Sequence, residues 1–147
     1  MSSAEKSEEV KEVQEVKEAK EPLQRIGSVR NDTDLLVYRQ AYRLALQVSR
    51  LTKLLPREEQ FELGRQLRRS ARSVAADTVE GWTKRNSASE FRRHLLIAAG
   101  EGAETRFWLE WALDEDFLLR KSADLLLKED AKLGFMIHKL WKEWRKL

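Results

Sequence analysis

Residues 63–81, LGRQLRRSARSVAADTVEG, decide the fold of this chain, because at about 100° per residue their side chains form three stripes. The apolar stripe predicts a helix with one buried face and contains Leu63, Leu67, Ala71, Val74 and Thr78. The opposite side is cationic and carries Arg65, Arg68, Arg69 and Arg72. A flanking stripe contains Gln66, Ser73, Asp77 and Glu80. This divided polar side predicts two different neighbours: water or an anion, and a second helix or subunit.

The segments on either side of this stretch read as helices as well. Apolar residues at 3–4 spacing predict a first helix over residues 35–55, with N-cap candidates at 31–34. Pro56 ends that helix and is suited to the first turn of the next one, which we expect to continue to a C-cap at Gly81. The short connection predicts that these two helices are antiparallel neighbours.

Two further helices complete the pattern. Ser87 and Glu90 have the spacing of a capping box, and the helix that follows has an apolar face of Phe91, Leu95, Ala98, Thr105, Leu109 and Ala112. Gly100 and Gly102 inside it are expected where another backbone approaches closely. Ser122 is the predicted cap of a last helix, whose buried positions are Leu126, Leu133, Ile137, Leu140, Trp144 and Leu147. Four helices with short connections predict an all-α, antiparallel up-down-up-down four-helix bundle over residues 31–147.

Composition and charge limit the class of protein. The chain has 147 residues, enough for one domain, and no cysteine, which fits a reducing cytoplasm. Its N-terminus lacks the apolar region of a signal peptide, and no apolar run reaches the length of a membrane span, so we expect a cytoplasmic protein without a membrane partner. Residues 1–30 alternate Glu and Lys around a few small apolar residues; they predict a mobile tail, or a helix that folds on a partner.

Candidate catalytic and metal-binding patterns are missing from the sequence. It has no cysteine nucleophile, no GxSxG turn and no phosphate loop followed by GK[ST]. A di-iron bundle needs Glu-x-x-His pairs, whereas His94 and His138 follow Phe91 and Phe135. We therefore expect no enzymatic activity, no cofactor and no metal, and we expect both histidines at a surface or an interface.

The arginine face points to nucleic acid. It is continued in sequence by a basic loop and the start of the third helix, which contribute Lys84, Arg85, Arg92 and Arg93. Arginine has a planar fork that suits phosphate, so this set predicts RNA or DNA binding with weak sequence specificity. A solvated helix surface, or pairing with glutamates of a neighbouring helix or subunit, remains the alternative.

Other residues point to an interface. We expect Gln66, Ser73, Asp77 and Glu80 to meet another helix or subunit, since they border the apolar face. Trp108 and Trp111 form a second apolar ridge that one bundle face cannot fully bury, and tryptophan concentrates at interfaces.

Several blocks of this sequence resemble the four-helix-bundle proteins encoded in intervening sequences of bacterial 23S rRNA genes, a superfamily that includes the accessory variability determinants of diversity-generating retroelements. The strongest block contains Gln66-Leu67-Arg68-Arg69-Ser70, Ser73-Val74 and Asp77-Thr78-Val79-Glu80-Gly81. Weaker ones are Asp34-Leu35-x-Val37-Tyr38-x-x-Ala41, Pro56-x-x-Glu59 and residues 96–105. Asp77 replaces the usual Asn, Glu101 the usual Ser and Gly102 the usual Leu.

The resemblance implies a homopentamer, nucleic-acid binding and, in the retroelement branch, a role as accessory subunit of a reverse transcriptase. Subunit contacts in a ring are heterologous, so each chain needs two different faces. An interaction scaffold with no nucleic-acid role is the alternative function.

Overall fold

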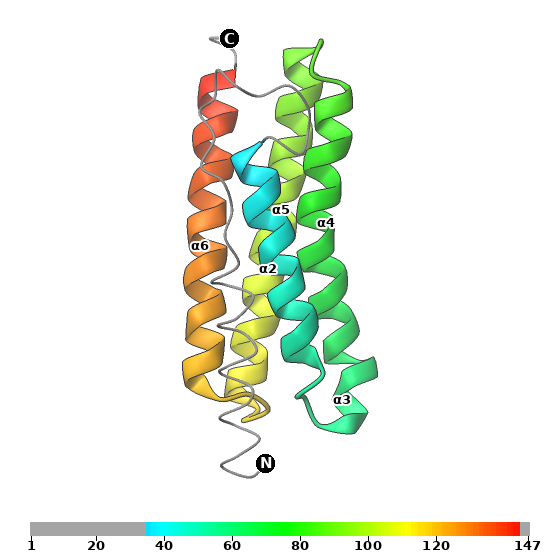
Figure 1. The fold of residues 1–147 in the computed structure, drawn as a ribbon, viewed down its shortest axis with the longest axis vertical. Helices are drawn as coiled ribbons and strands as arrows, with labels where there is room; N and C mark the ends of the chain where they lie inside the picture. The colour runs from blue at the N-terminus through cyan, green and yellow to red at the C-terminus, as the bar shows by residue number, and fades with distance from the viewer. Residues whose placement is uncertain (1–34, 145–147) are drawn as a thin grey trace.

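The structure is a computed structural model that describes residues 35–144 and contains helices alone in that range. Its elements are α2 (Leu36–Thr52), α3 (Arg57–Phe61), α4 (Leu63–Thr83), α5 (Ala88–Asp114) and α6 (Arg120–Glu143). The four long helices run antiparallel to their neighbours in chain order (Figure 1). α4 packs on both α2 and α5, and α6 packs on both α5 and α2. The predicted all-α bundle is confirmed.

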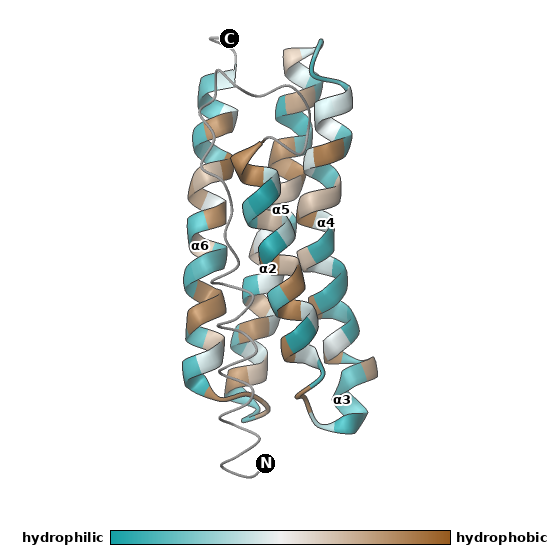
Figure 2. Cartoon of the chain, viewed as in Figure 1, coloured by the Kyte–Doolittle hydropathy of each residue, from teal (hydrophilic) through white to brown (hydrophobic). Residues whose placement is uncertain are grey.

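The apolar stripes predicted for the four helices meet in one core (Figure 2). Every member of the α4 stripe and of the α5 stripe is buried, including the hydroxyl-bearing Thr78 and Thr105. The Thr78 hydroxyl donates to the Val74 carbonyl, and the Thr105 hydroxyl donates to Ser70 of α4 at 2.9 Å. Both polar groups are therefore satisfied inside the core, which removes the penalty for burying them.

The helix boundaries differ from the prediction at three places. α2 begins after Leu35 and ends at Thr52, and the predicted N-cap residues 31–34 and tail 1–30 lie outside the described residues. The single helix expected from Pro56 onwards is interrupted at Glu62, which has φ −91° and ψ −82°, and this separates α3 from α4. Ser122 does not cap α6, which begins two residues earlier and buries the Ser122 side chain.

The three glycines singled out in the sequence have other roles than expected. Gly81 is not a C-cap but lies within α4, where an added Cβ would be 2.7 Å from the Cβ of His94 on α5. Gly81 is thus the residue that lets two helix backbones approach. Gly100 has nothing within 4 Å of an added Cβ, and the nearest atom at Gly102 is Asp130 Oδ1 at 3.6 Å. The prediction that another backbone approaches closely at these two positions is therefore wrong within the described chain.

The capping box at the start of α5 is half formed. Ser87 Oγ accepts a hydrogen bond of 3.3 Å from the Glu90 backbone N–H, as predicted. The Glu90 carboxylate accepts from Arg93 instead of from the Ser87 backbone.

Within the described residues, no helix is long and apolar enough to cross a membrane.

Candidate functional site

Two neighbouring arginines of α4 leave the helix toward opposite sides. Arg68 points to the α2–α3 turn, where Nη1 donates to Thr52 Oγ1 at 3.0 Å and Nη2 donates to the Gln60 carbonyl at 3.1 Å. Successive helix residues are separated by about 100°, which accounts for the divergence. Arg68 therefore ties the turn to α4.

Arg69 points to α5 and joins two of its acids. Its Nη2 donates to Glu104 Oε1 at 2.5 Å, and its Nη1 lies 3.5 Å from Glu101 Oε2. Glu104 also accepts from Trp108 Nε1 at 3.3 Å. The bond to Arg69 lowers the pKa of Glu104, whereas burial raises the pKa of Glu101. This pair lies at the surface of the bundle and orients Trp108.

The two other predicted arginines of α4 remain exposed. Within the described part of the chain, Arg65 makes no hydrogen bond or ion pair, and Arg72 makes one contact, from Nε to the Arg68 carbonyl at 3.1 Å. Neither forms an ion pair with a carboxylate in that range. They are thus the members of the predicted set that are most available to an external anion.

The remaining predicted cations lie near the α4–α5 loop and already contact protein groups. The Arg85 guanidinium is 4.3 Å from the centre of the Trp82 ring, and that of Arg92 is 4.0 Å from Trp141. Arg93 pairs with Glu90 at 3.2 Å. At 1.5 Å per residue, Lys84 lies about 18 Å along α4 from Arg72, so the eight cations form two separate groups.

The flanking stripe borders both neighbours of α4. Gln66, Ser73 and Asp77 are half-buried and Glu80 is exposed, while Ser73 returns a hydrogen bond to the Arg69 carbonyl at 2.8 Å. Burial, and then the nearby Glu80 charge, raises the pKa of Asp77. The Asp77 carboxylate has no hydrogen-bond donor within residues 35–144.

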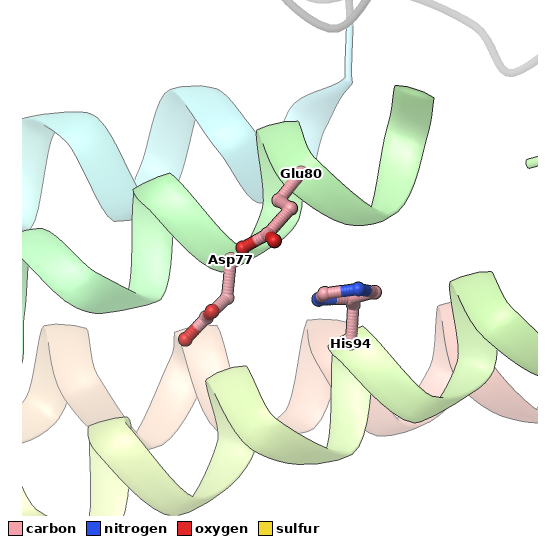
Figure 3. Close-up of side chains that lie close together, drawn as sticks. All are labelled: Asp77, Glu80 and His94. Carbon is pink, nitrogen blue, oxygen red and sulfur yellow. The ribbon is translucent and has the colours of Figure 1, made fainter. Parts of the chain in front are cut away.

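His94 of α5 meets this stripe. It is not a surface residue, because only 3% of it is exposed, and it lies directly opposite Gly81. One ring nitrogen faces Asp77 and Glu80 (Figure 3), and one ligand atom from each of the three residues lies within 4.8 Å of the others. Sequence spacing missed this cluster because its members come from two helices. Asp77 and His94 are separated from the centre of the α4–α5 loop by the same number of residues. In two antiparallel helices such residues lie opposite each other, and this signal could have predicted the contact.

Two unlike apolar surfaces remain uncovered in the described chain. The first is a mainly apolar groove of about 560 Å³ between α2 and α4, whose lining includes Tyr38, Tyr42, Leu46 and Val79 and also Arg72 and Glu80. The second is a ridge on α5 formed by Leu96, Phe107 and Trp111, which are 48%, 50% and 48% exposed. Trp111 is thus about half exposed, while Trp108 packs partly against the core, and the interface role of both stays a prediction.

Comparison with known proteins gives one family match and a structural likeness. The family model described as 23S rRNA-intervening sequence protein matches residues 33–139. A crystal structure from Bacteroides thetaiotaomicron, of a protein of unknown function from the S23 ribosomal protein family, superposes with a TM-score of 0.67 at 23% sequence identity. That likeness covers 73% of this chain and 99% of the other and concerns the fold. No curated protein matches the sequence.

Proposed function

The chain belongs to the 23S rRNA-intervening sequence protein family. We propose that it is a non-enzymatic, homopentameric bundle. We further propose that it binds RNA or DNA through phosphate contacts. The observation that carries this proposal is the charge of two helices that pack on each other. α2 and residues 63–76 of α4 together contain seven arginines and no acidic residue. Arg68 and Arg69 are engaged within the bundle, so the charge that we assign to nucleic acid is that of the exposed Arg65 and Arg72. Nucleic acid has a regular array of negative charge, which exposed arginines attract.

Within this surface, Arg65 and Arg72 are the proposed phosphate ligands. Both are exposed, and neither has a carboxylate partner in the described chain. Arg68 and Arg69 hold internal contacts and position the helix. Binding by such contacts reads backbone charge and not base sequence, so it depends steeply on salt.

The double variant Arg65→Gln/Arg72→Gln is expected to weaken binding to a structured RNA about tenfold and to flatten the salt dependence by roughly two phosphate contacts. Affinity measured over a salt series by fluorescence anisotropy checks this. The matched control is Arg120→Gln/Lys121→Gln, which removes two exposed positive charges at the start of α6. If the control weakens binding as much as the test variant, or if wild type shows no salt dependence, the arginine surface is not the binding site.

The proposed oligomer is supported by the two uncovered apolar surfaces. A ring in which each subunit contacts the next through different faces needs two complementary surfaces per chain. The α5 ridge is exposed and mainly aromatic, and the α2–α4 groove is mainly apolar, with Arg72 and Glu80 also in its lining. Arg72 thus borders both the proposed subunit contact and the proposed phosphate site. Gly100, on the same side of α5 as Leu96 and Phe107, leaves open space that a neighbouring helix would fill.

The variant Phe107→Gln/Trp111→Gln is expected to lower the mass in solution to that of a monomer while leaving the helical content unchanged, because both side chains are already half exposed in the single chain. Light scattering after size-exclusion chromatography measures the mass. Phe135→Gln is the control, since Phe135 is 72% exposed on α6 and lies outside both surfaces. An unchanged mass in the double variant would place the subunit contact elsewhere.

The resemblance to accessory variability determinants extends the proposal to a protein partner, a reverse transcriptase. The genomic neighbourhood separates the branches: a reverse-transcriptase gene with repeats supports the accessory role, and an rRNA gene supports the other branch. A second candidate function is an interaction scaffold without a nucleic-acid role. It is favoured by the internal contacts of Arg68, Arg69, Arg85, Arg92 and Arg93.

A further inference from the structure

We propose that Asp77, Glu80 and His94 bind one divalent transition-metal ion of the zinc type at the surface between α4 and α5. The close-up shows Asp77 and Glu80 of α4 near the imidazole of His94 on α5, with the Asp77 carboxylate turned away from the ring (Figure 3). One ligand atom of each residue lies within 4.8 Å of the other two. The proposal is independent of the nucleic-acid surface, which lies on other residues.

The imidazole is the fixed member of this set. His94 is 3% exposed, and its Nδ1 is buried without a hydrogen-bond partner in the described chain. Gly81 holds it there, because the absence of a Cβ lets the His94 Cβ approach the α4 backbone. A buried polar atom without a partner is costly, and a bound ion is one way to satisfy it.

The two carboxylates are placed to complete the coordination. Asp77 and Glu80 are three residues apart on α4, so they lie on neighbouring positions of one helix surface. Tetrahedral zinc with ligand bonds of about 2.1 Å needs ligand atoms about 3.4 Å apart. Rotation of the Asp77 and Glu80 side chains, which are half-buried and exposed, closes the remaining distance. The exposed side leaves a fourth position for water.

The chemistry of the donors selects the ion. Imidazole nitrogen suits zinc and its transition-metal neighbours, whereas magnesium and calcium prefer sets of oxygen ligands. One nitrogen and two carboxylates therefore favour Zn²⁺ over Mg²⁺. Both carboxylates are deprotonated when bound, so the site would neutralise the ion's charge.

Two cations of the chain lie beside His94 Nε2, the ring nitrogen opposite the unpartnered Nδ1 that we assign to the ion. Only Lys84 competes with the ion, because it also reaches Glu80. Lys84 Nζ lies 3.4 Å from His94 Nε2 and 3.9 Å from Glu80 Oε1. Arg93 Nη2 also lies 3.4 Å from His94 Nε2 and pairs with Glu90. Lys84 is the flexible competitor, because its side chain is 43% exposed and its ion pair with Glu80 is long. An ion that binds Glu80 must displace it.

The test is calorimetric titration of ZnCl₂ into the full chain, purified without a histidine tag and treated with chelator. We expect one Zn²⁺ per chain, and about tenfold or greater loss of affinity in Asp77→Asn, Glu80→Gln and His94→Gln. Glu80→Gln changes an exposed side chain and keeps the test valid if the buried His94→Gln variant does not fold. MgCl₂ in place of ZnCl₂ is expected to give no such site.

The matched controls are His138→Gln, which removes the exposed histidine, and Glu90→Gln, which removes a nearby carboxylate outside the cluster. Both are expected to bind as wild type does. Lys84→Met is expected to bind Zn²⁺ several times more tightly, because the competing ammonium is gone. The proposal is overturned if wild type binds no Zn²⁺, if Glu80→Gln binds as wild type does, or if His138→Gln abolishes binding.

Discussion

At pH 8, Asp130→Asn is expected to stabilise the fold by on the order of 4 kcal/mol, although it changes a single charge. Asp130 lies on α6 and is 7% exposed, and its Oδ1 has no hydrogen-bond partner in the described chain. Burial raises the pKa of Asp130 from 3.8 to about 7, and the charge of Arg106 offsets only part of that effect. Asparagine has nearly the same shape and no charge to bury.

The stabilisation has a defined pH window. Below pH 3.8 the carboxyl group is protonated in both the folded and the unfolded chain. Wild type and variant are therefore expected to have the same stability in this range. Between pH 3.8 and about 7 the unfolded chain releases the proton while the folded chain retains it. The wild type therefore loses stability as pH rises through this window, by up to about 1.4 kcal/mol per pH unit, and the loss is complete above pH 7.

Urea unfolding of wild type and Asp130→Asn at pH 4, 5, 6, 7 and 8 measures this difference. Asp77 and Glu101, whose pKa values are also raised, are present in both proteins, and their effects cancel in the comparison. Asp124→Asn is the control, because Asp124 is exposed on the same helix and pairs with Arg120 at the surface. A stability difference that stays constant with pH would show that Asp130 is not a buried acid.

Replacing Gly81 with alanine is expected to destabilise the bundle by about 2 kcal/mol, even though alanine favours a helix by about 1 kcal/mol relative to glycine. The added Cβ would lie 2.7 Å from the His94 Cβ and 3.2 Å from Phe91 Cδ2. These atoms belong to the packed side of α5, so they cannot move away without shifting the helix. The overpacking therefore exceeds the gain in helix propensity.

Thermal unfolding at one protein concentration tests the effect, with a decrease in Tm of about 8 °C expected for a domain of this size. The control is Gly134→Ala on α6, where an added Cβ has nothing within 4 Å. That variant is expected to be more stable than wild type by up to about 1 kcal/mol. Equal effects of the two alanines would contradict the close approach of α4 and α5 at Gly81.

In the metal-binding assay, Gly81→Ala is also expected to weaken Zn²⁺ binding, because it displaces His94.

The contact of Asp77 and Glu80 with His94 shows which part of a helix contact the sequence predicts and which part it does not. The stripe through Asp77 and Glu80 was expected to meet another helix or subunit, and both residues lie beside His94 of α5. The nature of that contact could not be predicted, because it depends on which α5 residue lies opposite. His94 was expected at a surface or an interface, and it is buried at the contact between α4 and α5, because Gly81 leaves room for it.

By itself the sequence determined the all-α class, the four helices of the core and the buried face of each helix. The reason is that a 3–4 spacing of apolar residues specifies the buried side of a helix without reference to its neighbours. It also determined the cap of α5, since Ser87 and Glu90 interact over three residues. Only the tertiary structure decided that Arg68 turns to α2 while Arg69 turns to α5, and that Asp130 is buried with its Oδ1 unpartnered among residues 35–144. Those outcomes depend on the relative register and rotation of packed helices, which bring residues far apart in the chain into contact and which helical periodicity does not encode.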